Sequence, residues 1–136
     1  MCVRLVPFAA FLLCLAGDGL VASALASETD LTGAWISGGT ECAEVFSGTG
    51  KKLTFKKAAA FEPAFIISGT QIRTPHATCR IKKVQPAGDR RMLTLACETG
   101  VAADEVPAIL GRGADGSLNR YFSADDTTGS RYRRCS

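Results

Sequence analysis

The sequence has little of what enzymes use for catalysis. Its 136 residues include one histidine, His76, which lies in a proline-containing segment, and no G-x-S-x-G, H-E-x-x-H or phosphate-cradling motif is present. The segment Gly111-Arg112-Gly113 lacks the strand and helix context that phosphate binding requires. Because catalysis needs a nucleophile, a tuned acid or base and a group that orients it, we expect a non-enzymatic protein without a cofactor.

Metal ligands are equally sparse. No C-x-x-C pair accompanies the single histidine, so the sequence predicts no metal site. A glycosidase would need two carboxylates that face each other across a cleft, and nothing in the spacing of the acidic residues predicts this. The close acidic pairs are Glu41 with Glu44, Asp104 with Glu105, and Asp125 with Asp126.

Long apolar runs are also missing. The apolar stretch near the start is shorter than the ~20 residues that a membrane-spanning helix needs, and Asp18 interrupts it. Small residues follow at Ala24 and Ala26, a pattern that is typical of a signal peptide. We expect residues 1–26 to be removed and residues 27–136 to form a single β domain without a membrane span. The protein would then be periplasmic or secreted.

No segment shows apolar periodicity over the length of a helix. Short apolar segments alternate with turn residues, which predicts an antiparallel all-β domain of about eight short strands. We expect a small barrel or half-open roll, with a sandwich as the alternative. Residues 40–46 fit either a helical turn or a strand. The expected strands cover residues 31–37, 53–55, 64–68, 71–73, the hairpin from 79 to 97, 109–112, 117–122 and 130–135.

The segment from Cys79 to Cys97 is the most informative in the chain. Residues 86–89 carry turn chemistry, because Pro presets φ and Gly supplies a positive φ. Folding about this turn places Cys79 opposite Cys97 and Ile81 opposite Leu95, and directly opposed residues share a face of the sheet. The predicted core face therefore holds Cys79, Ile81, Leu93, Leu95 and Cys97, while Arg80, Lys82, Thr94 and Ala96 point the other way.

Four cysteines remain after the signal peptide, an even number that indicates two disulfides in an exported domain. Four cysteines allow three connectivities, and spacing alone does not choose among them. The hairpin favours a bridge between Cys79 and Cys97. That pairing leaves Cys42 to meet Cys135, which would tie the end of the domain to its start.

The net charge of +3 is mild, and no run of basic residues exceeds two. Such a surface serves solubility and protects strand edges from association. The alternative is a surface that binds an anionic small molecule, an anionic polymer or a negatively charged protein target. The basic pairs are Lys51-Lys52, Lys56-Lys57, Lys82-Lys83, Arg90-Arg91 and Arg133-Arg134.

Two further motifs indicate how the later strands pair. Asp115-Gly116 predicts a two-residue hairpin loop. Pro107 predicts a strand edge or a bend, because proline has no N–H to donate to a neighbouring strand. A turn over residues 125–129 would join the last two strands.

Basic and aromatic residues interleave in these last two strands. Counting about the final turn places Tyr121 opposite Tyr132 and Arg120 opposite Arg133. Rings and charges so close together could form a stacking platform for a ligand. Nucleic acid is not expected as a partner of an exported protein. The candidate ligand-binding residues are Trp35, Arg120, Tyr121, Arg131, Tyr132 and Arg133.

Residues 31–35, Leu-Thr-Gly-Ala-Trp, are similar to the G-x-W on the first strand of lipocalin-like barrels. In that family the tryptophan plugs one end of the barrel, and an arginine from a late strand lies across its ring. The resemblance implies this role for Trp35, with Arg120, Arg131 or Arg133 placed over it through a cation–π contact.

The G-x-W and the nearby Cys42 also resemble the small periplasmic barrels that inhibit bacterial metalloproteases. Those proteins insert a flexible N-terminus into the protease, which would correspond to residues 27–30 here. The layout also resembles small exported bacterial proteins without an assigned activity. We expect a binding module that holds a small ligand or inhibits a protein. The alternative is a structural or envelope-associated protein that binds anionic surface polymer.

Overall fold

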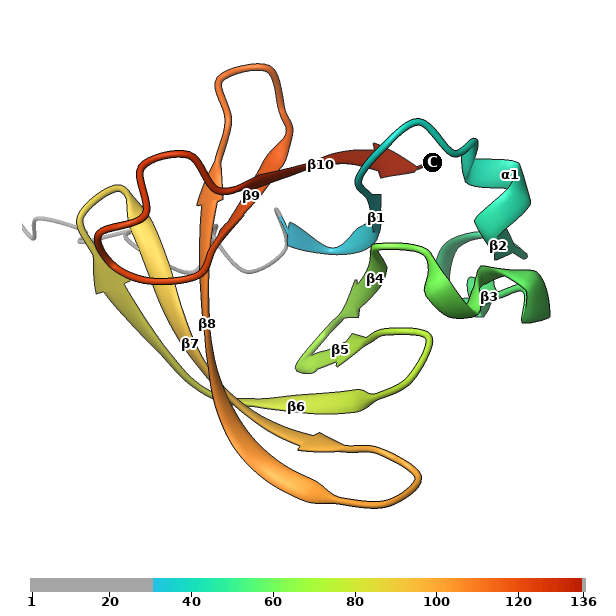
Figure 1. Ribbon diagram of the computed structural model, residues 1–136, viewed down its shortest axis with the longest axis horizontal. Helices are drawn as coiled ribbons and strands as arrows, with labels where there is room; N and C mark the ends of the chain where they lie inside the picture. The colour runs from blue at the N-terminus through green and yellow to red at the C-terminus, as the bar shows by residue number, and fades with distance from the viewer. Residues whose placement is uncertain (1–30, 136) are drawn as a thin grey trace, which may run out of the picture.

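The computed structural model describes residues 31–135, so the predicted signal peptide and the segment 27–30 lie outside the described residues. Eight strands form a closed antiparallel barrel in the order β1-β10-β9-β8-β7-β6-β5-β4 (Figure 1). The prediction of an all-β barrel is confirmed, with a closed barrel in place of a half-open roll. The barrel strands are Gly33–Ile36 (β1), Ala64–Ser68 (β4), Gln71–Arg73 (β5), Thr78–Ala87 (β6), Arg90–Glu98 (β7), Ala103–Arg112 (β8), Leu118–Tyr121 (β9) and Ser130–Cys135 (β10).

A small group of elements lies at one side of the barrel, next to β1 and β4 (Figure 1). Residues 40–46, which fitted a helical turn or a strand, contain a single helical turn and then enter a short strand. Strand β2 pairs with β3 in a separate two-stranded sheet. The elements of this group are Cys42–Val45 (α1), Phe46–Ser47 (β2), Thr54–Phe55 (β3) and two 3-10 turns over Gly50–Lys52 and Lys57–Phe61.

The β6–β7 hairpin has the predicted pairing near its open end, where Cys79 lies opposite Cys97 and Ile81 opposite Leu95. A bulge follows between Ile81 and Lys83 and shifts the register by one residue. The strands then continue until Ala87 pairs with Arg90, so the loop contains only Gly88 and Asp89. Pro86 is part of β6 and not of the turn, because the extra residue in the bulge shortens the loop.

The inward face of this hairpin also matches the prediction. Cys79, Leu93 and Leu95 are buried in the main core, and Ile81 and Cys97 pack against it. The Cys79–Cys97 and Cys42–Cys135 bridges are both formed, which confirms the favoured connectivity. The second bridge joins α1 to β10 and so fixes the small side group to the barrel.

The hairpin between β8 and β9 forms where Asp115-Gly116 predicted it, but its loop is longer than two residues. The last strand pair is Arg112 with Leu118, and the N–H of Gly113 donates to the carbonyl of Ser117. The N–H of Gly116, at φ +82°, donates to the carbonyl of Gly113 at 3.1 Å. This geometry is a three-residue loop that ends in a left-handed glycine.

The predicted pairing of β9 with β10 is wrong. Tyr132 lies opposite Leu118, and Arg120 lies opposite Ser130. The register is shifted by three residues because Asp126 organises a longer loop, in which its carboxylate accepts hydrogen bonds from the backbone N–H groups of Phe122, Thr128 and Gly129. A shift of three residues reverses the face on which a side chain lies.

The described residues form two apolar clusters. The first fills the barrel and includes Trp35, Phe65, Leu110 and Leu118. The second lies between β1, β4 and the side group, and Val45 is fully buried in it. The alternation of β1 explains this arrangement, because Trp35 points into the barrel while Ala34 and Ile36 point outward into the second cluster.

Within residues 31–135, no helix is long and apolar enough to cross a membrane. Strand β8 extends beyond its partner on one side, since β9 pairs only with its last four residues, from Ile109 to Arg112. The first half of β8 therefore pairs with β7 alone. Pro107 lies in this half, opposite Thr94, which confirms the predicted strand edge.

Candidate functional site

Trp35 plugs one end of the barrel. Its side chain is 0% exposed, and its indole N–H donates to the carbonyl of Leu31 at 2.9 Å. The guanidinium of Arg134 lies 4.8 Å from the ring centroid, and that of Arg112 lies 5.9 Å away. A late-strand arginine therefore covers the tryptophan as the resemblance implied, but its identity differs from the three residues expected.

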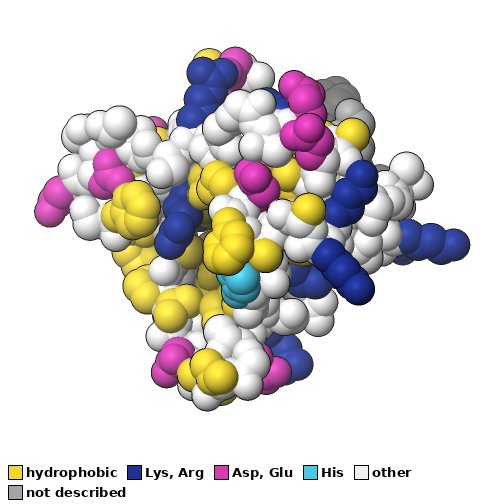
Figure 2. Space-filling model, turned by 45° about the vertical axis from the view of Figure 1, so that its right-hand side comes forward, with side chains coloured by type: hydrophobic (Ala, Val, Ile, Leu, Met, Phe, Trp, Pro, Cys, Tyr) yellow, Lys and Arg dark blue, Asp and Glu magenta, His cyan; other side chains and the backbone are white. Residues whose placement is uncertain are grey.

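The opposite end of the barrel opens into a cavity of about 440 Å³. It is bounded by the loop between β5 and β6, the first half of β8, the start of β4 and the end of β9. Figure 2 shows hydrophobic side chains gathered around the imidazole of His76, with a basic side chain among them. The apolar lining includes Phe65, Ile72, Leu95, Leu110 and Tyr132, together with the Cys79–Cys97 bridge.

Arg120 lines this cavity and is one of the residues of β9 that face the interior of the barrel. It lies opposite Leu110 of β8, which is buried in the core, and two residues along the strand from fully buried Leu118. Opposed residues share a face of a sheet, so Arg120 projects on the barrel's inner face. Its guanidinium remains exposed because it lies at the open end, 5.1 Å from the ring centroid of Phe122.

Two exposed phenylalanines lie near the cavity. Phe122 follows β9 and contacts Arg120, and it is 74% exposed. Phe61 is 94% exposed, and its ring centroid lies 6.2 Å from that of His76, a cavity-lining residue. Exposed apolar side chains beside an apolar cavity are typical of a binding surface.

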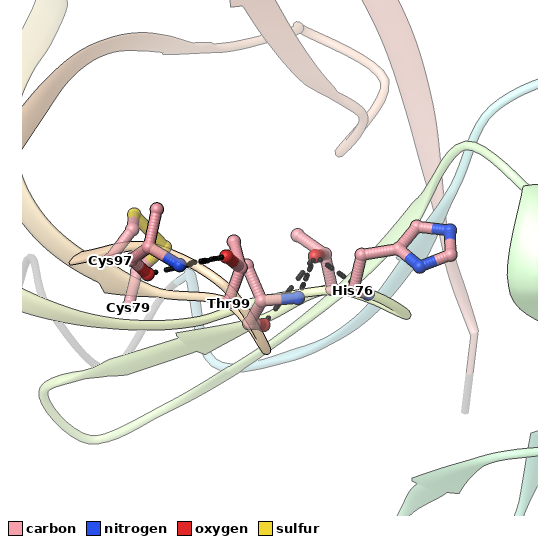
Figure 3. The surroundings of a disulfide bond; sticks show 7 residues. His76, Cys79, Cys97 and Thr99 are labelled. Atoms are coloured by element: carbon pink, nitrogen blue, oxygen red, sulfur yellow. Dashed lines mark hydrogen bonds between the residues drawn. A yellow bond between two sulfur atoms is a disulfide. The ribbon is translucent and has the colours of Figure 1, made fainter. Parts of the chain in front are cut away.

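The loop that carries His76 is fixed by Thr74. The Thr74 hydroxyl accepts hydrogen bonds from the N–H groups of His76, at 3.3 Å, and Ala77, at 2.9 Å. In Figure 3 the imidazole of His76 is directed away from the Cys79–Cys97 bridge. The imidazole is exposed, as the sequence predicted for a surface histidine.

Asp126 holds the loop that presents Phe122. The backbone N–H groups of Gly129, Phe122 and Thr128, in order of effect, donate to its carboxylate and lower its pKa below the ordinary range. The positive charge of Arg90 adds a smaller effect in the same direction, and partial desolvation opposes both. The ionised form of Asp126 is therefore the one that organises the loop between β9 and β10.

Of the two predicted tyrosines, only Tyr132 reaches the cavity. Tyr132 lines the cavity and packs on Phe65, with 4.8 Å between ring centroids. Tyr121 lies on the outer face of the barrel, where the guanidinium of Arg90 is 3.5 Å from its ring centroid. The expected stacking of the two tyrosines is wrong, because the register of β10 places them on opposite faces.

Arg131 and Arg133 make contacts within the protein instead. Arg131 forms an ion pair with Asp115 in the β8–β9 loop. Arg133 donates to the carbonyl of Thr40 at 2.6 Å and to Sγ of Cys42 at 2.9 Å. Of the six candidate ligand-binding residues, only Arg120 and Tyr132 meet in the cavity.

Sequence reasoning did not predict Phe61 or Val106 near the cavity. Phe61 follows an alanine-rich segment and resembles an ordinary core residue in the sequence, whereas Phe122 belongs to the interleaved basic and aromatic residues of the expected strand 117–122. Val106, in the half of β8 that β9 does not pair with, lines the cavity itself and is 38% exposed. No local signal identifies Phe61 and Val106, because their exposure depends on where distant strands end.

A second cavity of about 270 Å³ lies beside the plugged end and is partly lined by Lys82, Lys83 and Arg91. It is smaller than the cavity at the open end. In the described part of the chain, no group of three or more His, Cys, Asp or Glu side chains is arranged to hold a metal ion.

In comparisons with known proteins, no protein-family model, no curated protein and no solved structure matches this chain. The geometry of the cavity at the open end is therefore the basis of the proposal that follows. Its two chemical features are the apolar lining and the single inward-facing arginine at its mouth.

Proposed function

We propose that the protein is an exported, non-enzymatic binding module that holds a small, largely apolar molecule in the cavity at the open end of its barrel. The observation that carries the proposal is this cavity of about 440 Å³, which continues the apolar interior of the barrel to the surface. Ligand sites are concave and mostly apolar, with volumes of about 300–1,000 Å³, so this cavity is suited to a small ligand.

Two oxidised bridges support export. Disulfides form and persist in oxidising compartments, and all four cysteines of the described residues are paired. We therefore place the protein in the periplasm or outside the cell. The predicted signal peptide points the same way.

The lining of the cavity argues for binding rather than catalysis. Its titratable side chains are Glu62, His76, Arg120 and Tyr132. Oxygen Oε2 of Glu62 accepts a hydrogen bond from Thr40, and the guanidinium of Arg120 packs on Phe122. A nucleophile activated by an adjacent base, which covalent catalysis needs, is not among the cavity residues.

Two alternatives have less support. Binding of anionic polymer through Arg131 and Arg133 would compete with the contacts these residues already make to Asp115, Thr40 and Cys42. Inhibition of a protease by residues 27–30 would depend on a segment outside the described residues. The apolar cavity is a specific feature that neither alternative uses.

Binding of N-phenyl-1-naphthylamine, an uncharged fluorescent probe, tests the proposal. We expect the fluorescence of the probe to rise and saturate when the purified protein, without its signal peptide, is added. Val106→Trp would fill the cavity and weaken binding by at least about tenfold, since most of the apolar contact area of the probe would be lost.

Val101→Trp is the matched control. Val101 is 97% exposed and does not line the cavity, so the same substitution there should leave binding unchanged. Circular dichroism would check that both variants fold. Probe binding that is absent, or that Val106→Trp does not reduce, would refute the proposed function.

A further inference from the structure

We infer that the ligand is an amphipathic anion with one apolar chain, which inserts the chain into the cavity and places a carboxylate on Arg120. The inference rests on the proposed function and adds the chemical class of the ligand. It depends on the position of Arg120, on the contacts of the other arginines and on the charges around the cavity.

Arg120 places a permanent positive charge on the inner face of the barrel, at the cavity. Arg120 occupies a register position between buried Leu110 on β8 and Ser130 on β10, where an apolar side chain would continue the core. Removing a guanidinium from water is unfavourable unless it is paired. At the open end of the barrel Arg120 keeps its hydration until a ligand covers it, and a carboxylate would then replace the lost water.

The donors of Arg120 are available to such a ligand. Among residues 31–135, no carboxylate forms an ion pair with Arg120, and its contact is with the ring of Phe122. The exposed Arg131, by contrast, is paired with Asp115. The planar guanidinium fork matches a carboxylate in a two-point hydrogen bond, which adds geometric specificity to charge attraction.

The other charged and titratable groups on the cavity indicate where the head group binds. Glu62 lines the cavity beside β4, and its carboxylate would repel an anion. Arg120 projects from β9, so the anionic head is favoured there, beside Phe122. His76 lies on the cavity lining, in the loop between β5 and β6.

The size of the cavity indicates a single chain. Its volume of about 440 Å³ is near the lower limit of the range for small-molecule sites. A lipid with two acyl chains would leave much of its apolar surface in water. We therefore favour a free monocarboxylate over a membrane lipid as the source of the ligand.

Isothermal titration with decanoate and with decanol tests the inference. We expect the folded protein to bind decanoate roughly tenfold more tightly than decanol, since a hydrogen bond to a charged group contributes more than one to a neutral group. Arg120→Gln should weaken decanoate binding by about tenfold and leave decanol binding unchanged. Arg120→Lys, which keeps the charge and loses the fork, should fall between the wild type and Arg120→Gln.

Arg131→Gln is the matched control. Arg131 is also an exposed arginine of the last two strands, but it does not line the cavity, so decanoate should bind this variant as it binds the wild type. Equal affinities for decanoate and decanol, or equal losses for both in Arg120→Gln, would overturn the inference. Neutral-probe binding would still support the proposed function in that case, so the two failures are distinguishable.

Sedimentation with vesicles of phosphatidylglycerol distinguishes a free monocarboxylate from a membrane lipid as the ligand. We expect the protein not to sediment with these vesicles at physiological salt, and decanoate to remain bound in their presence. Arg120-dependent sedimentation that competes with decanoate would instead assign the site to a membrane lipid and contradict the free monocarboxylate.

Discussion

The two disulfides should contribute unequally to stability, because they close loops of very different length. Cys42 and Cys135 are separated by 93 residues, and Cys79 and Cys97 by 18. In the chain-entropy treatment, a bridge stabilises the fold by restricting the unfolded chain, and its effect rises with the logarithm of the loop length. The calculated contributions at 25 °C are about 4.6 kcal/mol for the long loop and about 3.2 kcal/mol for the short one.

Double substitution with alanine tests this order. We expect Cys42→Ala with Cys135→Ala to lower the free energy of unfolding by about 1.4 kcal/mol more than Cys79→Ala with Cys97→Ala. The packing losses should be similar, since Cys79 and Cys135 are each 5% exposed while Cys42 and Cys97 are partly buried. The difference between the two variants therefore isolates the effect of loop length.

Guanidinium denaturation, followed by far-ultraviolet circular dichroism, measures the two free energies. Arg133→Gln in the wild-type background is a control, because Arg133 donates to Sγ of Cys42 and would lose that contact in the first variant. We expect this control to cost less than about 1 kcal/mol, as is typical of an exposed charged group. An equal or larger loss in the hairpin variant would refute the reasoning from loop length.

Three further predictions concern packing, backbone conformation and pH. Trp35→Ala should cost about 3–5 kcal/mol in chemical denaturation, because the fully buried indole fills one end of the barrel. Gly129→Ala should lower the melting temperature more than Gly38→Ala: both glycines have positive φ, but only at Gly129 would a Cβ approach Tyr121, at 2.9 Å. Asp126 has a lowered folded-state pKa, so its contribution is present above the unfolded-state pKa and lost as the pH falls through the folded-state pKa. The difference in denaturation midpoint between the wild type and Asp126→Asn should therefore disappear in acid.

The parts of the fold that local pattern determines could be predicted from the sequence. The β6–β7 hairpin is one such part, since alternation of apolar residues and two cysteines at matching distances from a turn define both register and inward face. Because the hairpin pairs Cys79 with Cys97, Cys42 and Cys135 are the two cysteines that remain to form the second bridge. The bulge between Ile81 and Lys83 could not be predicted. It shifts the strand register by one residue beyond Ile81 but leaves the alternation of apolar residues at the open end of the hairpin unchanged.

The candidate site was only partly accessible to sequence reasoning. Arg120 and Tyr132 were identified as ligand-binding candidates, and both line the cavity. The pairing that was used to group them was wrong, because the three backbone hydrogen bonds to Asp126 lengthen the loop in a way that composition does not reveal. With the actual register Tyr132 and Arg134 face inward together, which is why Arg134 covers Trp35.

The closure of the barrel has a consequence for the order of assembly. Strand β1 pairs with β4 on one side and with β10 on the other, so its second neighbour is synthesised after all the other strands of the barrel. Until β10 emerges, β1 presents an open row of backbone donors and acceptors to any other chain nearby. A nascent or truncated product that lacks β10 would also carry an unpaired thiol at Cys42. The reactivity of this thiol would distinguish incomplete molecules from complete ones.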